Sequence, residues 1–491
     1  MFHGATEAGK IAIWILAFLL PLQLLVGLLM TKKGGQSSKH YFISNKQLPT
    51  WLIFCAEFAT ACSVSCFLGY SGKSYQIGLG QFWMVFGEQG GKFLFAILLA
   101  GIAGRYAYNT IGEFMEQEMF HDKFLRAATG FALSLTMIAW TGATAIGIGS
   151  LLAVVLKVDP TTGIWVAALV AILYTMMGGS WAIVWTDVIQ GGIRLVVGLI
   201  FYGVLYYVTG GFGDLHTKLV STKPQLLSFG AAGFRESSAL LLTSITGLFT
   251  FPAYWQRCFS AKNSKAAFRG YLYTSCFAFL MYSLSVYAGM VAFSRNPNLP
   301  RPDMAFPYLL NTYVHPLLAG LMVVAIIGAD MTVSATLLNA GVTMWTVDII
   351  KPYFKLDATD KQLVQIARWM TLVMGVGVVG AAFSFPTIIS AGLWGYQMAG
   401  GGLFIPMMLG LYWKDANGRT KVTKNAALAS LLIAGSLAAW IQFDPALLKI
   451  FGGGINPGLF LSLILTVGIS VYERGRIQNN AEPEPVKEVV K

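Results

Sequence analysis

Apolar stretches long enough to cross a bilayer follow one another along the whole chain, separated by short polar turns. A helix needs about 20 mainly apolar residues to span about 30 Å of hydrocarbon. No polar stretch is long enough to form a soluble domain. The pattern predicts an all-α integral membrane protein with about 13 transmembrane helices. The stretches are 11–30, 50–78, 82–103, 127–156, 161–178, 187–209, 238–256, 270–293, 316–347, 366–385, 388–412, 425–443 and 455–472.

Charge is sparse and sits mainly between these stretches. Only 11% of the residues are charged, against about a quarter in soluble domains. The net charge of +12 does not indicate nucleic acid, because the basic residues cluster in short loops, where they orient membrane proteins. We therefore expect a small-molecule solute and membrane lipid as partners, and no nucleic acid. The five cysteines lack the paired or metal-site spacing that would favour disulfides or a metal centre.

The distribution of the basic residues also predicts the orientation. An odd number of spans puts the termini on opposite sides of the membrane. With the N-terminus outside, the cytoplasmic loops hold 23 of the 34 lysines and arginines, Arg257 among them, as the positive-inside rule requires. We predict a multi-pass protein of the cytoplasmic (inner) membrane with its C-terminus in the cytoplasm. The oligomeric state stays open, since lipid-facing and subunit-facing apolar surfaces look alike in sequence.

Two stretches contain residues that interrupt helices. Positions 59–66 of the second stretch are mostly small or carry hydroxyl or thiol groups, and Pro252 lies deep in the seventh. A spanning helix breaks where its freed backbone groups line a cavity or an ion site. The two breaks are five stretches apart, so their helices run in opposite directions, as in an inverted five-plus-five repeat. The alternative is that small residues merely allow close helix packing.

The segment 178–190, GGSWAIVWTDVIQ, closely resembles the hallmark of the solute:sodium symporter family. Residues 67–79, 256–262 and 338–349 resemble other parts of that family. The resemblance covers nearly the whole chain and implies a transporter of LeuT-type fold, with one helix before the repeats and two after. The parts it implies are 1–49 (N-terminal helix and cytoplasmic loop), 50–209 (first repeat), 210–237 (extracellular loop), 238–412 (second repeat), 413–473 (two C-terminal helices) and 474–491 (cytoplasmic tail).

The same resemblance implies a cation site where the first break meets the ninth stretch. The carbonyl oxygens would come from Ala59, Cys62 and Ala329, and hydroxyl oxygens from the adjacent positions 332 and 333. Thr332 supplies such an oxygen. Val333 does not, although relatives that use sodium usually have serine or threonine there. Sodium is therefore the expected coupling ion, at a site that has lost one of five ligands.

A second cation position, found in some relatives, would join hydroxyls of the ninth stretch to the acid of the Trp-Thr-Asp motif. In this chain these residues are Thr332, Thr336 and Asp187. The competing interpretation of Asp187 is an ordinary helix-start residue, favoured by the positive end of the helix dipole.

Charges expected inside spans usually have a partner or a function. Arg194 follows Asp187 by two helical turns and faces the same way. Three interpretations of Arg194 stay open: an ion pair with Asp330, a guanidinium that replaces a missing cation or binds a substrate carboxylate, and a side chain that reaches the cytoplasmic interface. Glu57 and Glu88 also fall within spans, as hydrogen-bonded structural acids or as proton carriers.

The solute is expected at mid-membrane, between the two interrupted helices. Few residues there carry hydrogen-bonding groups, whereas a hexose needs many, so the pattern favours a small amino acid or carboxylate. The residues expected to face the solute are Ser63, Cys66, Gly247, Leu248, Phe249 and Phe251, with Trp140 and Thr141 as weaker candidates.

Cation-coupled symport by alternating access is the function we predict. A proton-coupled or ion-independent carrier or exchanger on the same fold is the first alternative, suggested by Val333 and Arg194. A membrane sensor is the second, although only about twenty residues follow Val471, too few for a kinase domain. No nucleophile–base pair or metal-ligand cluster in the sequence supports an enzyme.

Overall fold

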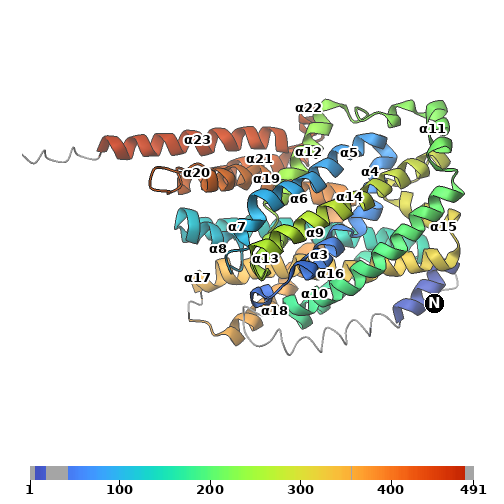
Figure 1. Ribbon diagram of the computed structural model, residues 1–491, viewed down its shortest axis with the longest axis horizontal. Coiled ribbons are helices and arrows are strands. Elements are labelled where there is room, and N and C mark those ends of the chain that lie inside the picture. Colours follow the sequence, from blue (N-terminus) through green and yellow to red (C-terminus); the bar gives the residue numbers. More distant parts are fainter. Residues whose placement is uncertain (1–5, 18–20, 22–41, 355–356, 481–491) are drawn as a thin grey trace, which may run out of the picture.

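The computed structural model describes residues 6–17, 21, 42–354 and 357–480, without the side chains of Asn45, 177–182, Ala329 and 477–480. Most of its helices run along the long axis of Figure 1. Eight described helices are long and apolar enough to cross a membrane, by length and composition. An all-helical membrane protein is thereby confirmed. The number of thirteen spans stays a prediction, and most of the first stretch, 11–30, lies outside the described residues.

The long helices form the body of the bundle, in which α9 and α16 pack on each other and on α10 and α18. They are α9 (Lys123–Leu156), α10 (Pro160–Val208), α12 (Gly233–Phe249), α14 (Ser264–Arg295), α16 (Pro316–Met344), α18 (Asp360–Ser384), α19 (Ile388–Tyr412) and α23 (Ile455–Asn480). The shorter helices are α3 (Thr50–Ala61), α4 (Tyr70–Ile77), α5 (Phe82–Val85), α6 (Gly91–Phe95), α7 (Gly101–Ala103), α8 (Ile111–Met115), α11 (Gly211–Thr222), α13 (Pro252–Ser260), α15 (Ala305–Tyr313), α17 (Lys351–Phe354), α20 (Lys424–Ala429), α21 (Gly435–Ile441) and α22 (Pro445–Phe451).

Both interruptions lie inside the bundle. Helix α3 ends at Ala61, and a π-helical turn that leads into α4 starts at Ser65. Helix α12 ends at Phe249, and α13 starts at Pro252, whose missing N–H and fixed φ suit the first position of a helix. The chain therefore leaves helical geometry twice at buried positions.

Two close contacts show where the chain turns back on itself. The Tyr70 hydroxyl lies 3.1 Å from the Glu88 carboxylate, although a straight helix would separate these residues by about 27 Å. The chain reverses between them at Gly78, whose φ of 55° favours glycine. In α10, the Tyr174 hydroxyl lies 2.6 Å from the Thr186 hydroxyl, against about 18 Å along a straight helix. These reversals separate the predicted stretches 50–78 from 82–103, and 161–178 from 187–209.

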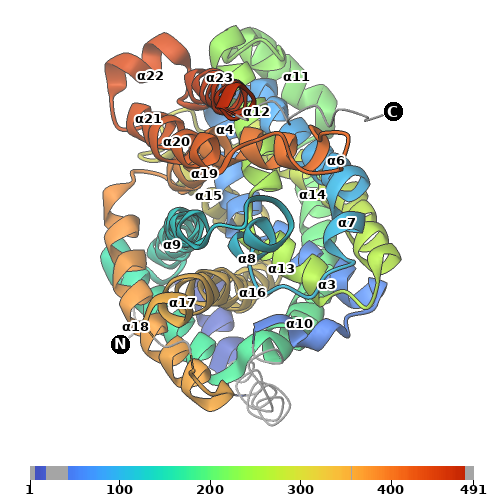
Figure 2. The ribbon, with the colours of Figure 1, turned by 90° about the vertical axis from the view of Figure 1, so that its left-hand side faces the viewer.

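The two ends of the described chain lie at opposite ends of the bundle. The described N-terminal segment 6–17 lies at the right in Figure 1, whereas α23 ends at the left. Figure 2 views the bundle from that left end, almost along α9 and α23, with α8 and α17 towards the viewer. We call this the α8 end and the opposite one the α11 end. Helix α23 continues to Asn480, so the first residues of the predicted tail are helical.

Close packing of α14 on α4 gives a test of this arrangement. A Cβ atom added at Gly289 would lie 2.1 Å from the Ser71 carbonyl oxygen. Gly289→Ala should destabilise the protein by about 1–3 kcal/mol, because the backbones must separate. The matched control is Gly468→Ala in α23, where a Cβ meets nothing within 4 Å and alanine favours the helix. Thermal unfolding in detergent measures both, and equal melting temperatures would contradict the packing described.

Candidate functional site

A small cavity lined by buried residues lies between the two helix breaks. Its volume is about 30 Å³, room for one or two water molecules. Its polar lining comes from Thr60, Ser63, Ser65, Thr144 and the carboxylate of Glu88. Its aromatic walls are Tyr70, Trp140, Phe251, Tyr254, Tyr282 and Tyr396. The cavity is therefore mainly aromatic, with hydroxyl groups on the side of the first break.

The predicted solute-facing residues divide into two groups. Ser63 and Phe251 line the cavity, as does the weaker candidate Trp140. Cys66 instead contacts the Ser285 hydroxyl, with 3.6 Å between sulfur and oxygen. Thr141 donates a hydrogen bond to the Met137 carbonyl within its own helix.

The three other predicted residues at the second break are not among those that line the cavity. A Cβ atom at Gly247 would lie 2.3 Å from the ring of Tyr396, so this ring covers the glycine. Leu248 is fully buried, and the Phe249 ring packs edge-on against Phe95 of α6 and Phe404 of α19. These packing roles are invisible in the sequence, because Tyr396 lies about 150 residues away.

Glu88, which lines the cavity, already has a positive partner. The Lys92 amino group lies 3.6 Å from its carboxylate, and both side chains are buried. The same amino group lies 5.7 Å from the centre of the Tyr254 ring and 5.6 Å from that of Tyr282. The Tyr70 hydroxyl donates to the other carboxylate oxygen. Ion pairing and cation–π contacts together hold this charge pair in an apolar setting.

At the first break, a guanidinium group contacts two of the predicted cation ligands. Nη1 of Arg194 donates to the carbonyl oxygens of Ala59, at 2.8 Å, and of Cys62. The next freed group, the N–H of Val64, donates to both carboxylate oxygens of Asp330, at 3.0 and 2.8 Å. Ala329, the third predicted carbonyl, lies in α16, and its surroundings are outside the described part of the chain.

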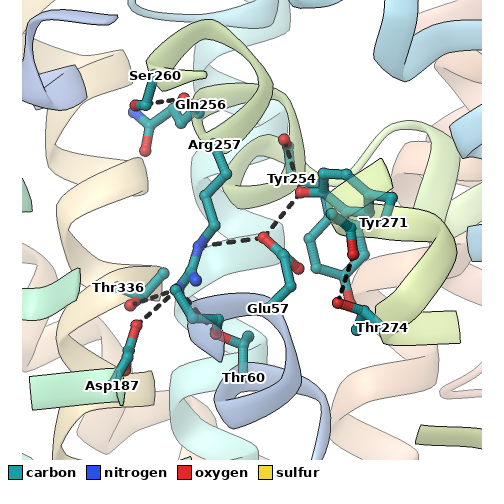
Figure 3. Close-up of polar contacts among 12 residues, drawn as sticks. Glu57, Thr60, Asp187, Tyr254, Gln256, Arg257, Ser260, Tyr271, Thr274 and Thr336 are labelled. Carbon is teal, nitrogen blue, oxygen red and sulfur yellow. Dashed lines mark hydrogen bonds and ion pairs between the residues drawn. The ribbon is translucent and has the colours of Figure 1, made fainter. Parts of the chain in front are cut away.

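At the second predicted cation position, the Arg257 guanidinium binds the carboxylate of Asp187, the acid of the Trp-Thr-Asp motif (Figure 3). Its Nη2 lies 3.0 Å from the Asp187 carboxylate, 2.8 Å from the Thr60 hydroxyl and 3.3 Å from that of Thr336. Its Nε lies 3.1 Å from the Glu57 carboxylate. Helices α3, α10, α13 and α16 are thus tied together by one buried side chain.

This arrangement corrects the expectation that Arg257 is a cytoplasmic-loop residue. Arg257 lies in α13 and its side chain is only 6% exposed. Thr332, also predicted for the cation site, is a hydrogen-bonding partner of Asp187. Tyr271 donates to the Glu57 carboxylate at 2.7 Å. In the sequence, the only sign of this role is that a charged residue follows Pro252 closely.

The charges around the first break do not balance. Asp187, Glu57 and Asp330 are carboxylates and Arg194 and Arg257 are guanidinium groups, so these five fully or nearly fully buried residues carry a formal excess of one negative charge. Oδ1 of Asp187 and Oε2 of Glu57 are buried without a hydrogen-bond partner among the described residues. An uncompensated buried charge is strongly unfavourable, so the cluster attracts one positive charge.

The Arg257 cluster lies next to the cavity, because Thr60 belongs to both. Thr60 lines the cavity, while Arg257 and Thr336 line a second, smaller cavity of about 20 Å³ towards Phe42 and Leu48, at the α8 end. Towards the α11 end, an open cavity of about 780 Å³ lies between α4, α12, α19 and α22. Leu393 and Gln397 of α19 line it, and Tyr396 of the same helix lines the inner cavity.

The family model described as "Sodium:solute symporter family" matches residues 41–434. The chain belongs to this family. It is therefore classed as a sodium-coupled solute symporter of the membrane, and not as an enzyme. The interrupted helices are consistent with this family. A break inside a membrane span needs buried hydrogen-bonding partners, and the residues described above supply them.

Several transporters are similar to this chain over about nine-tenths of its length. The high-affinity proline transporter PutP of Bacillus subtilis (strain 168) is 27% identical, covering 93% of this chain and 97% of its own. The sodium/pantothenate symporter of Haemophilus influenzae is 27% identical (90% and 92%), and the sodium/glucose cotransporter of Vibrio parahaemolyticus 26% (89% and 87%).

Solved structures show the fold. A substrate-bound, outward-open sodium-coupled sialic acid symporter superimposes with a TM-score of 0.75, at 20% identity and with 94% of this chain and 98% of that chain covered. A nucleobase-cation-symport-1 family transporter in a closed conformation gives a TM-score of 0.55 at 14% identity, covering 88% and 95%. The expected LeuT-like fold is confirmed.

Removing Arg257 tests the buried cluster. Arg257→Leu leaves Glu57 and Asp187 buried and unpaired, which should cost about 3–5 kcal/mol of stability. Adding Glu57→Gln and Asp187→Asn should recover part of this loss. The control is Lys218→Ala, which removes a half-exposed ion pair with Asp214 and should cost under about 1 kcal/mol. Thermal unfolding measures all of them. An Arg257→Leu protein as stable as the control would contradict the account.

Proposed function

We propose that the protein imports a small polar solute, such as an amino acid or a carboxylate, across the inner membrane together with one monovalent cation. The observation that carries the proposal is the small buried cavity between the two helix breaks, with the Arg257 cluster next to it on the α8 side and the larger cavity on the α11 side. The solute site of an alternating-access carrier is expected there. The proposal also includes an extracellular N-terminus and inverted repeats over 50–209 and 238–412.

Two donors in the cavity support a solute with a carboxylate. Ser65 Oγ and Trp140 Nε1 are buried and have no hydrogen-bond partner among the described residues. Ser65 starts the helical segment after the first break, and the start of a helix favours negative charge. A solute carboxylate that accepts from both groups would satisfy them. Glu88 adds little, since Lys92 and Tyr70 already hold it.

The names of the relatives supply the first solutes to test. One is a proline transporter, one a pantothenate symporter and one a glucose cotransporter. Proline and pantothenate carry a carboxylate, whereas glucose does not and needs many hydrogen-bonding groups. The largely aromatic cavity supports the two acids over the sugar.

The charge excess supports one coupled cation for each solute. Sodium is the first candidate, because the family is sodium-coupled. A proton is the second candidate, since the unpartnered oxygens of Asp187 and Glu57 are on carboxylates that either ion can neutralise.

Uptake into proteoliposomes tests the proposal. Proline or pantothenate should accumulate under an inward sodium gradient and not in choline, while glucose should not accumulate. Uptake in choline under an inward proton gradient would favour the second candidate. Lack of uptake of every carboxylate-bearing solute tried, under either gradient, would contradict the proposal.

Variants of the two donors sharpen this test. Ser65→Ala and Trp140→Phe should each raise KM for the solute by about tenfold or more, since a hydrogen bond to a charged group contributes about 1.5–3 kcal/mol. Ser283→Ala is the control, because this partly exposed serine donates only to Phe279 of its own helix. Unchanged KM in both variants would remove these residues from the site.

A further inference from the structure

Two carbonyl oxygens at the end of α3 converge on one nitrogen atom. Ala59 and Cys62 lie in and just after the last turn of α3, where carbonyl groups lose their helical donors. Nη1 of Arg194 donates to both of these oxygens. An ion bound to the same two oxygens would have to lie where this nitrogen lies.

The Arg194 side chain is built into the protein interior. It starts on α10 and is fully buried. Its Nε and Nη2 have no hydrogen-bond partner within the described residues, so the guanidinium is directed at the break by Nη1 alone. Asp330 of α16 is a buried carboxylate on the other side of the break, and its negative charge favours the charged guanidinium. Asp330 in turn binds the N–H of Val64 across the break.

Helix dipoles explain why these two charges lie where they do. The C-terminal end of α3 carries a partial negative charge, and the N-terminal end of the following segment a partial positive one. A cation at the first end and a carboxylate at the second stabilise the break. The break thus favours a positive charge beside Ala59 and Cys62, whatever its source.

The other oxygens that would complete an ion cage are absent or engaged. Val333, which faces the cavity from α16, has no side-chain oxygen. The Thr332 hydroxyl interacts with Asp187. Thr336 donates to the Thr332 carbonyl and accepts from Arg257. A sodium ion at this position would find neither space nor a full set of ligands.

We propose that Arg194 is the resident cation of this position: its guanidinium permanently fills the site at which family members are expected to bind a sodium ion. The charge at the break is then part of the chain and is not released at each transport cycle. The coupled cation of the proposed function must bind elsewhere, at the carboxylate excess near Asp187. The inference rests on that proposed function, but the experiment that tests it needs no solute.

Cation-dependent stability of purified variants tests this proposal. Arg194→Ala exposes the two carbonyl oxygens and leaves Asp330 without its counter-charge. Low millimolar guanidinium, or sodium, should raise the melting temperature of this variant by about 3 °C or more beyond its effect on the wild type, by mass action. Choline at the same ionic strength should not. Gly289→Ala serves as a control that is destabilised without gaining a cation site.

A response of Arg194→Ala to guanidinium and sodium no larger than that of the wild type or of Gly289→Ala would overturn the proposal. If Arg194→Ala does not fold, the charge-balanced variant Arg194→Ala with Asp330→Asn takes its place. Free guanidinium should stabilise it, because the carbonyls of Ala59 and Cys62 regain a donor, and no stabilisation would again overturn the proposal. Failure of solute uptake in the wild type bears on the proposed function alone.

Discussion

A helix that breaks inside a membrane frees backbone groups that lipid cannot hydrogen-bond, and this constraint organises the structure. At the first break, the Ala61 carbonyl accepts from the Tyr282 hydroxyl at 2.7 Å, while Arg194 and Asp330 satisfy the groups on either side. At the second, the Phe249 carbonyl accepts from the Trp255 ring at 2.7 Å. The partners of the first break come from α10, α14 and α16, so these helices must pack around it.

The same partners determine how the site works. Arg194 and Arg257 both bind to α3, yet they differ in function. Arg194 supplies a charge that the broken helix favours, whereas Arg257 joins α13 and α3 to α10 and α16 on the α8 side of the cavity. In the proposed function, opening that side of the cavity would separate the Arg257 contacts. A cation or proton that neutralises Asp187 or Glu57 weakens their attraction to Arg257, so the proposal links cation binding to this opening.

The breaks, the family and the charged residues Asp187 and Arg194 could be found from the sequence, because glycine, proline and intramembrane charges are rare enough to be informative. The partners could not. Arg257 was expected in a loop, and its contacts with Glu57 and Asp187 join positions far apart in the chain. The tyrosines that wall the cavity come from several helices, and only packing decides that Tyr396 covers Gly247. Tertiary contacts of this kind leave no periodic pattern in sequence.

The most direct test of the account is the number of cations carried with each solute molecule. Reversal potentials of solute flux in proteoliposomes, measured over a range of sodium gradients, give this ratio. Arg194 fills one cation position and the remaining carboxylates carry one excess negative charge, so the account predicts one cation for each solute. A ratio of two, with a second sodium ion lost on mutation around Ala59 and Cys62, would contradict it.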